Sequence, residues 1–525
     1  MEEIKTEGIH KPIGLVLGLV LFVLFLVLPS LGLPFGDKPA THRMAAVAAL
    51  MAIWWITEAI PLAATSLMPL VVMPFLKILT PEAVAQSYMN DYIFLFIGGF
   101  TIALAMQRWN LHRRLALHTI RLVGDRPRQI VLGVMIATAF ISMWMSNTAT
   151  AMMMMPIALS VVLLAEEQEK KGNRGTEKGL AARFGLVLML GVAYAASIGG
   201  MATLVGTPPN VIFASRFRAE FPGAPEIGFA RWMMIAFPFS VVFLLVTWGL
   251  LTFVLHPLRG GRFWGGREAI GRKLAQLGPI NRAEIGVLTV FLCAALLWVF
   301  RVDIPIGKAT IPGWSNALGL VEEKAKWVGD GTVAMMAGLS LFFIPSGRKK
   351  GERLVDWKTV EDLPWNVLFL FGGGFALADG FVASGLSDWL GDQCRSFGKL
   401  PVPGQILAVS GVTTFLSELA SNTATANMVL PILAGVARAI SINPLVLMFP
   451  ATISASLGFA LPVATPPNAI VFGTGYVPMS AMVRAGLLLD LVGMILVLPF
   501  IYFVAIPLWQ IDPTHLPASW LAAGP

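Results

Sequence analysis

A short polar phrase occurs twice in this chain, and it constrains the fold more than any other feature. SNTATAMMMMP runs from Ser146 to Pro156, and SNTATANMVLP runs from Ser421 to Pro431, 275 positions later. FIGGF at 96–100 and FGGGF at 371–375 are separated by the same 275 positions. Chance similarity between apolar stretches would not repeat the polar residues. We therefore infer that the chain arose by doubling of a half-length unit and that both halves contribute to one site.

The composition places this doubled chain in a membrane. Of its 525 residues, 56% are hydrophobic and 13% are charged, whereas soluble proteins carry about 25% charged residues. An apolar helix of ~20 residues crosses a ~30 Å hydrocarbon core. A multi-spanning membrane protein is predicted rather than a soluble enzyme. Nine apolar segments predict helices near 13–34, 43–60, 62–79, 92–108, 229–257, 284–301, 329–345, 364–386 and 480–508.

Four further apolar regions, 129–165, 184–215, 402–440 and 443–475, are interrupted by polar residues, Gly and Pro and contain the motifs. Basic links flank the first of them, and positive loops stay in the cytoplasm. A re-entrant hairpin at 129–165 keeps both flanks cytoplasmic, whereas a full crossing does not. The repeat then makes 402–440 a second hairpin, entering from the opposite face.

These features predict an all-α polytopic membrane protein with about 11 transmembrane helices plus two re-entrant hairpins. The two halves form an inverted repeat, which is a common plan in transporters. The N-terminus is predicted to be cytoplasmic and the C-terminus outside, in the cell (inner) membrane. The net charge of +8 is assigned to cytoplasmic loops, so no nucleic-acid partner is expected.

The SNT phrases suit an anion. Ser and Asn are good N-caps, and a helix N-terminus carries roughly half a positive charge that attracts carboxylates. Asn147, Thr148, Asn422 and Thr423 add amide and hydroxyl donors. The alternative is that these residues only pack helices together, but their repetition in register favours a site.

A third pair of repeated segments supplies backbone carbonyls, which complement the donor groups of the SNT phrases. GTPPNVIF begins at Gly206 and ATPPNAIVF begins at Ala464. Proline lacks an amide donor and disfavours helix in the preceding residue, so Thr207 and Thr465 are predicted to lie in unwound backbone. The exposed carbonyls would suit sodium. No Arg or Lys lies within the motifs, so sodium would also supply the charge that a buried dianion needs.

The acidic residues at membrane depth are functional candidates by default, namely Glu58, Asp379, Glu418 and Asp490. Glu418 is the best candidate for a proton-coupled alternative. It has no counterpart in the first half, where Met143 occupies that place, so we favour a structural or rim role for it.

The chain resembles the divalent anion/sodium symporter family of di- and tricarboxylate carriers over almost its whole length. The resemblance is carried by the paired SNT motifs, by WWITEAIPLAATSLMP at 54–69, and by a C-terminal signature. The signature residues are Ser456, Phe459, Pro462, Val463, Ala464, Asn468, Ile470 and Val471.

The resemblance implies a sodium-coupled transporter of C4-dicarboxylates such as succinate, malate or fumarate. It implies a homodimer in which a transport domain moves against a scaffold, as in an elevator. Scaffold helices would lie in 1–128 and 258–401, and transport-domain parts in 129–257 and 402–525. No organic cofactor is implied.

The resemblance also assigns the site residues. The substrate carboxylates would be held by Ser146, Asn147, Thr148, Ser421, Asn422 and Thr423, with Thr207 and Thr465 nearby. One sodium site would use Ser142, Ser146, Asn147 and the carbonyl of Gly206. The other would use Ser417, Ala420, Asn422 and the carbonyl of Ala464.

Several alternatives remain open at this point. Some family members exchange dicarboxylates or citrate without sodium, and a sulfate carrier and a proton-coupled carrier are the other transporter hypotheses. A membrane-embedded enzyme is disfavoured because no histidine accompanies the motif hydroxyls. A passive anion channel would need no cation site. The sequence fixes neither the preferred substrate, nor symport against exchange, nor the sodium stoichiometry, nor the resting orientation.

Overall fold

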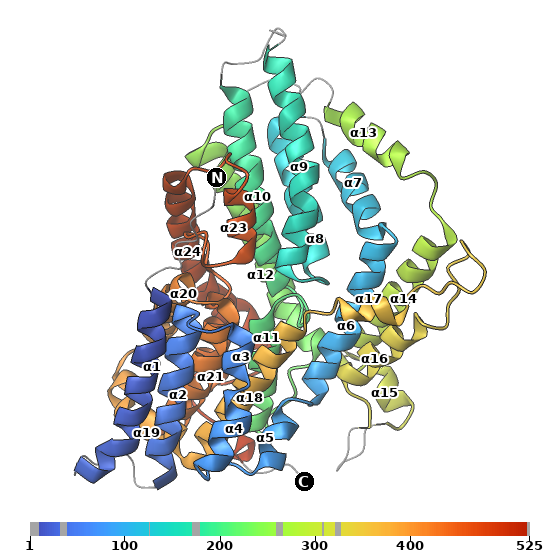
Figure 1. The fold of residues 1–525 in the computed structure, drawn as a ribbon. Helices are drawn as coiled ribbons and strands as arrows, with labels where there is room; N and C mark the ends of the chain where they lie inside the picture. The colour runs from blue at the N-terminus through green and yellow to red at the C-terminus, as the bar shows by residue number, and fades with distance from the viewer. Residues whose placement is uncertain are drawn as a thin grey trace.

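The computed structural model describes residues 10–31, 39–124, 126–170, 179–258, 266–306, 309–320 and 327–521, and it is a helical bundle (Figure 1). The two strands in these ranges, β1 (Ile304–Ile306) and β2 (Ala309–Ile311), pair antiparallel. The predicted long helices are present, with most ends within four residues of expectation. They are α1 (His10–Val27), α2 (Pro39–Thr57), α6 (Asp91–Arg108), α12 (Phe229–Gly249), α14 (Arg282–Val299), α16 (Asp330–Ser340), α18 (Trp365–Ser384) and α24 (Met479–Phe500).

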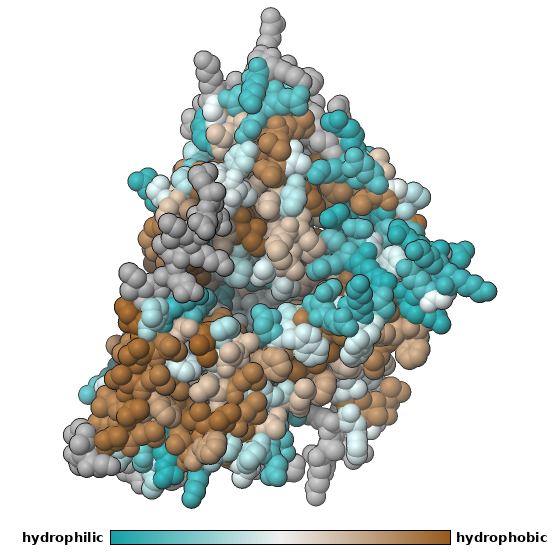
Figure 2. Space-filling model, in the orientation of Figure 1, coloured by the Kyte–Doolittle hydropathy of each residue, from teal (hydrophilic) through white to brown (hydrophobic). Residues whose placement is uncertain are grey.

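Seven helices among the described residues are long and apolar enough to cross a membrane. Four shorter apolar helices accompany them, and the count of about eleven crossings stays a prediction. The helix α1 exposes Leu and Val side chains along most of its length, in the hydrophobic region at the lower left of Figure 2. Such a surface is expected where side chains face lipid. The seven helices are Pro81–Arg108, Asn147–Lys170, Leu180–Met201, Phe229–Leu255, Arg282–Val299, Trp365–Ser384 and Met479–Trp509.

The four motif regions form interrupted helices, two in each half. In the first half a four-residue turn joins α8 to α9, and α10 packs against both helices before it breaks and continues as α11 (Figure 1). In the second half α20 and α21 form the corresponding pair, and α22 packs against both before the break that precedes α23. The bounds are α8 (Pro127–Ser142), α9 (Asn147–Lys170), α10 (Leu180–Met201), α11 (Pro208–Glu220), α20 (Val402–Leu419), α21 (Asn422–Ala439), α22 (Leu445–Ser454) and α23 (Pro466–Phe472).

The segment predicted as one helix at 62–79 is divided into α3 (Leu62–Ser66) and α4 (Met68–Phe75). Pro69 lies in the first turn of α4, and proline both lacks an amide donor and disfavours helix before it. A third short helix, α5 (Pro81–Ser87), leads into α6.

The basic stretch after α6, treated above as a link, contains the amphipathic helix α7 (Leu111–Val123). His112 is buried on its inner face, and its Nδ1 lies 2.9 Å from the carbonyl oxygen of Met106. Burial lowers the pKa of His112 to about 4, so the ring is neutral at pH 7. The helix α13 (Gly266–Gln276) packs on α7. Residues 171–178 and 259–265 of the other basic links lie outside the described residues.

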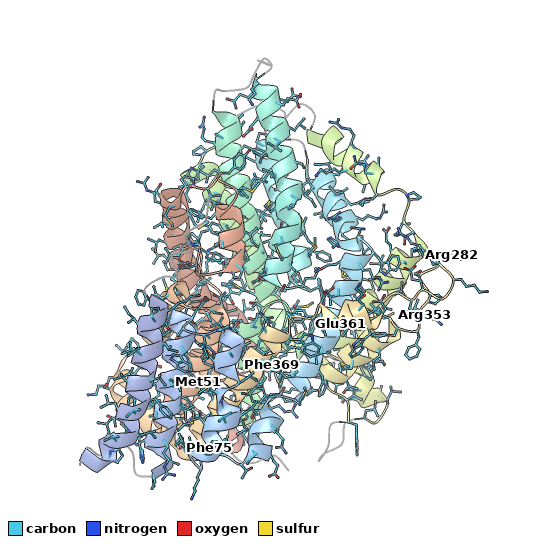
Figure 3. All side chains as sticks on the ribbon, in the orientation of Figure 1. Met51, Phe75, Arg282, Arg353, Glu361 and Phe369 are labelled. Atoms are coloured by element: carbon cyan, nitrogen blue, oxygen red, sulfur yellow. The ribbon has the colours of Figure 1, made fainter. Side chains whose placement is uncertain are left out.

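A polar edge runs along the right of the molecule in Figure 2. Arg282, Arg353 and Glu361 are labelled on this side of the molecule in Figure 3, and Phe75 is labelled at the lower end of the same view. The α16–α17 loop reaches this edge as well, because a Cβ on Gly347 would lie 3.1 Å from the Arg282 side chain. The helix α17 (Trp357–Glu361) follows that loop.

The repeated glycine phrase serves close helix packing in both halves. A Cβ on Gly98 in α6 would lie 2.3 Å from the backbone of Ala334 in α16. A Cβ on Gly373 in α18 would lie 2.3 Å from the carbonyl oxygen of Ser66 at the end of α3. Small residues of this kind let membrane helices approach at backbone distance.

Candidate cation and anion site

The first SNT phrase forms the turn between α8 and α9. Ser142, the last residue of α8, donates a hydrogen bond from Oγ to Oδ1 of Asn147 at 2.8 Å. Ser146 caps the second arm, since its Oγ accepts a hydrogen bond from the backbone N–H of Ala149 at 3.3 Å. The turn therefore fixes the Asn147 side chain at the N-terminus of α9.

The second SNT phrase repeats the central contact. Oγ of Ser417 donates to Oδ1 of Asn422, again at 2.8 Å, and also lies 2.6 Å from the carbonyl oxygen of Ala455. Ser421 occupies the N-cap position of α21, but its side chain makes no capping hydrogen bond. The Ser–Asn pair is thus common to both turns, whereas the serine cap predicted for both forms only in the first.

Both TPPN segments are unwound, as predicted. Thr207 has φ −145° and ψ 143°, and Thr465 has φ −141° and ψ 144°. These extended residues precede the prolines that begin α11 and α23. Both threonines are buried. Each half therefore has a hairpin turn and a helix break. At both places the helix ends leave backbone N–H and C=O groups without an intrahelical hydrogen-bond partner.

The first turn and the first break lie against each other. A Cβ on Gly206 would lie 2.4 Å from the carbonyl oxygen of Gly200, and a Cβ on Gly200 would lie 2.3 Å from Oδ1 of Asn147. Ser142 joins this group through its bond to Asn147. Hydroxyl, amide and carbonyl oxygens thus converge, and unwound carbonyls of this kind coordinate sodium in transporters.

The second turn and break come together in the same way around Gly458. A Cβ there would lie 3.2 Å from Cβ of Ala464, 3.4 Å from the carbonyl oxygen of Ser417 and 3.5 Å from Cγ2 of Thr465. Ala420 lies next to this group, at the end of α20, with extended backbone (φ −137°, ψ 167°). The predicted second sodium set is therefore also a spatial cluster.

Contacts between the halves place the two clusters in one unit. The helices α9 and α10 pack against α23, and α11 packs against α21 and α22. Thr423 is buried and Thr148 is half-buried. The N-termini of α9 and α21 contribute partial positive charge beside the two SNT phrases.

The four acidic candidates have different environments. Glu58 is exposed, at φ 47° in the turn after α2. Asp379 pairs with Arg216 of α11, with Nη1 and Oδ1 3.0 Å apart. Asp490 is buried in α24.

Glu418 is buried, which corrects the idea that it lies at the rim. Its carboxylate accepts hydrogen bonds from the backbone N–H groups of Ala460 and Leu461, at 2.8 and 3.1 Å. These amides belong to the break between α22 and α23. The structural role favoured from the sequence therefore agrees with these contacts.

The sequence reasoning missed two kinds of residue at this site. The first comprises Asn210 and Asn468, which cap carbonyls of the two breaks. Their signal was present, because each is the Asn of a repeated TPPN. The second is Trp144 in the first turn, whose ring stacks near Phe229 and Trp298 and meets the edge of Phe291. No spacing rule marks an aromatic cluster assembled from three distant segments.

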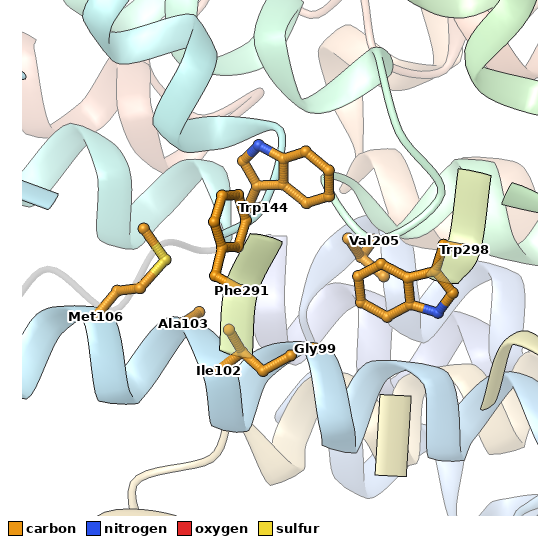
Figure 4. A pocket seen from close by; sticks show the side chains of 8 residues that line it. All are labelled: Gly99, Ile102, Ala103, Met106, Trp144, Val205, Phe291 and Trp298. Carbon is orange, nitrogen blue, oxygen red and sulfur yellow. The ribbon is translucent and has the colours of Figure 1, made fainter. Parts of the chain in front are cut away.

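Trp144 also borders a small apolar cavity of about 10 Å³, room for about one water molecule (Figure 4). The cavity lies where the first turn and break meet α6 and α14. It is lined by Gly99, Ile102, Ala103, Met106, Trp144, Val205, Phe291 and Trp298.

Comparison with known proteins shows the family of this chain. Residues 10–511 match the family model described as "Sodium:sulfate symporter transmembrane region". The chain belongs to this family. The resemblance inferred from the SNT motifs is thereby confirmed, and the family is one of membrane transporters.

Two relatives within the family are similar over nearly the whole chain. The sodium-dependent dicarboxylate transporter SdcS of Staphylococcus saprophyticus is 41% identical over 515 residues, which are 98% of this chain and 95% of that protein. SdcS of Staphylococcus aureus strain NCTC 8325 is 41% identical over 506 residues, covering 95% and 92%. Among solved structures, Neisseria gonorrhoeae MtrF superposes with a TM-score of 0.55 at 13% identity, covering 94% of this chain and 95% of that one. The MtrF likeness concerns the fold alone.

Proposed function

We propose that this protein is a sodium-coupled symporter of C4-dicarboxylates. The observation that carries the proposal is the duplicated Ser–Asn contact, at 2.8 Å in both turns, beside a helix N-terminus and a helix break. The similarity of the chain to sodium-dependent dicarboxylate transporters supports the choice of ion and substrate class. Succinate, malate and fumarate are the substrates that we propose first.

In the proposed mechanism, the two SNT phrases hold the two carboxylates of one substrate. The amide and hydroxyl groups of Asn147, Thr148, Asn422 and Thr423 donate to the carboxylate oxygens, and the helix N-termini of α9 and α21 add partial positive charge. Thr207 and Thr465 line the same region from the breaks. These donors recognise a carboxylate without providing a full countercharge.

Sodium provides that charge in the proposal. The motifs hold no Arg or Lys, and an unpaired dianion at membrane depth is costly. One sodium would bind near Ser142, Asn147 and the Gly206 carbonyl, and the other near Ser417, Asn422 and the Ala464 carbonyl. Because substrate and sodium stabilise each other, neither crosses efficiently alone, which couples their transport.

We also propose that residues 129–257 and 402–525 move as a transport domain against a scaffold formed by 1–128 and 258–401. The proposal includes a homodimer, a cytoplasmic N-terminus and an outer C-terminus. The two clusters support this division, because every contact that builds them joins elements within the proposed transport domain. Movement of this domain as a unit would carry substrate and sodium together, as in an elevator.

The first test is uptake of labelled succinate into proteoliposomes, with and without an inward sodium gradient. Accumulation that requires sodium in empty vesicles is expected. Asn147→Ala and Asn422→Ala should each lower uptake by at least ~100-fold, because each removes a donor to substrate and a sodium ligand. Unlabelled malate should compete, and sulfate should compete poorly. Uptake by either variant at the wild-type rate would remove that residue from the site.

The same vesicles distinguish an exchanger. Uptake only into vesicles preloaded with dicarboxylate, at a rate independent of sodium, would contradict symport and favour exchange. Saturation and accumulation against a gradient distinguish both from a passive channel.

A further inference from the structure

Each helix break contains a completely buried asparagine three residues after its extended threonine. Asn210 follows Thr207, and Asn468 follows Thr465. The two asparagines occupy the same position in their breaks, so both can have the same role. Neither side chain makes an observed hydrogen bond to the proposed substrate or sodium groups, and the function proposed above makes no use of them.

The two side-chain amides bind carbonyls on the N-terminal side of each break. In the first, Nδ2 of Asn210 donates to the carbonyl oxygens of Gly200, Met201 and Thr203, at 3.1, 3.2 and 2.7 Å. In the second, Nδ2 of Asn468 donates to the carbonyl oxygens of Gly458 and Leu461, both at 3.0 Å.

The carbonyls of Gly206 and Ala464 are left out of this pattern. The prolines that follow Thr207 and Thr465 lack N–H groups, and the backbone N–H groups of Asn210 and Asn468 donate to those threonines instead. Among the described residues, no hydrogen bond reaches the carbonyl oxygens of Gly206 or Ala464. These are the carbonyls proposed above as sodium ligands.

Packing alone does not account for the choice of an amide. Oδ1 of each asparagine is buried without a donor among the described residues, and an unmet buried acceptor is destabilising. In both breaks the asparagine leaves its Oδ1 unpaired within the described part of the chain while its Nδ2 binds backbone carbonyls. The donor end of the amide is therefore what the two positions share.

We infer that Asn210 and Asn468 are positioning residues that hold the backbone of each break so that the carbonyl of Gly206 or Ala464 faces sodium. By binding two or three carbonyls on the N-terminal side, each amide fixes the backbone of its break, while the carbonyl of Gly206 or Ala464 accepts no hydrogen bond from the described residues. Without the amide, the carbonyls that it binds would lose their donor and the break would change shape, which would displace the carbonyl of Gly206 or Ala464. The inference rests on the sodium coupling proposed above.

The test is sodium-dependent succinate uptake in proteoliposomes by Asn210→Ala and Asn468→Ala. Each variant should raise the sodium concentration for half-maximal uptake by at least ~10-fold. The KM for succinate at saturating sodium should stay within about twofold of the wild-type value. If each break holds one sodium, the Hill coefficient for sodium should also fall toward 1 in each variant.

Serine variants cover the case in which alanine prevents folding. Asn210→Ser and Asn468→Ser keep one short donor, so they should fold more readily and show a smaller shift in the same direction. Asn443→Ala is the matched control. Asn443 is also completely buried, but its Oδ1 accepts from the backbone N–H of Leu445 at the start of α22, away from the break. This control should lower thermal stability without changing sodium dependence.

The outcomes separate this inference from the proposed function. If wild-type uptake is independent of sodium, the proposed function fails. If wild-type uptake requires sodium but the serine or alanine variants keep the wild-type half-saturating concentration, the positioning role is overturned. A fall in maximal rate or stability alone, with sodium dependence unchanged, would likewise overturn it and leave a structural role.

Discussion

At the scale of single residues, the two proposed sodium carbonyls differ in the space around them. A Cβ on Gly206 would lie 2.4 Å from the carbonyl oxygen of Gly200 and 2.9 Å from its Cα. These are backbone atoms, which cannot yield as a flexible side chain can. In the second break, Ala464 already carries a Cβ. This atom lies 3.2 Å from the position that a Cβ added to Gly458 would occupy. The sequence shows that both residues are small. It does not show that the space for a side chain is tighter at Gly206 than at Ala464.

Gly206→Ala is therefore expected to distort the first break and to raise the half-saturating sodium concentration by at least ~10-fold, or to abolish uptake. Ala464→Gly removes a side chain without a clash, so it should retain uptake within about threefold of wild type. Sodium-dependent succinate uptake by the two variants measures the difference. Equal effects of the two changes would show that the close contact at Gly200 does not limit the site.

At the scale of helices and turns, the two hairpin tips differ although their SNT phrases match. Trp144 in the first turn packs against Phe229, Phe291 and Trp298, with ring centroids 4.9 to 6.5 Å apart. The corresponding residue 275 positions later is Leu419, which is 50% exposed. The aromatic cluster therefore holds one tip against α12 and α14, whereas the other tip has no equivalent cluster among the described residues.

Trp144→Ala is expected to lower the free energy of unfolding by about 3 kcal/mol, near the lower end for loss of a large aromatic side chain. Hydrogen exchange at residues 143–146 should become faster because the turn loses its packing. Leu419→Ala is the control and should change stability by less than about 0.5 kcal/mol, as exposed substitutions usually do. Equal destabilisation by the two changes would contradict the asymmetry between the tips.

Sequence reasoning located the long helices and motif breaks but not α7. Apolar periodicity and polar interruptions are local signals, and the repeat gave a second copy of each. The helix α7 has an amphipathic pattern in a strongly basic stretch, and charge alone led us to treat it as a link. Its role depends on burial of His112 and on packing of α13 against it, which no local pattern encodes. The same holds for the partners of Trp144.

At the scale of the whole molecule, a buried ionic network joins segments from both halves. Arg301 donates from Nε to Asp330 at 2.6 Å and from Nη2 to Glu226 at 2.8 Å. Asp330 also accepts from the backbone N–H of Phe229 at 2.8 Å. Glu226 and Phe229 belong to the segment that leads into α12, whereas Arg301 and Asp330 follow α14 and begin α16.

Arg301→Met should cost about 3–5 kcal/mol, because it removes the charged partner of the buried Asp330 carboxylate. The matched control is Arg395→Ala, which breaks an exposed pair with Asp392 and should cost at most about 1 kcal/mol. Thermal unfolding of the purified protein compares the two. Similar losses would mean that the network contributes no more than a surface ion pair.

A second ionic contact joins the proposed transport domain to the proposed scaffold. Arg216 of α11 pairs with Asp379 of α18, and its guanidinium lies 5.0 Å from the centre of the Phe375 ring. Ser87 of α5 donates to the other carboxylate oxygen of Asp379. The Arg216 side chain is 3% exposed and that of Asp379 is 39% exposed. If the transport domain moves against the scaffold as proposed, this contact must break when the domain leaves its present position and form again when it returns.

Asp379→Asn should therefore weaken the present conformation by about 1–3 kcal/mol, between the values for exposed and buried pairs. That range corresponds to a roughly 5- to 150-fold larger population of the open state, measured as faster hydrogen exchange in α11 and α18. Ser87→Ala is the control, since it leaves the ion pair intact and should have a smaller effect. Arg216→Met combined with Asp379→Asn should open little more than either change alone, because both remove the same contact. Fully additive effects would show that the two residues act separately, and the contact would then not hold the domains together.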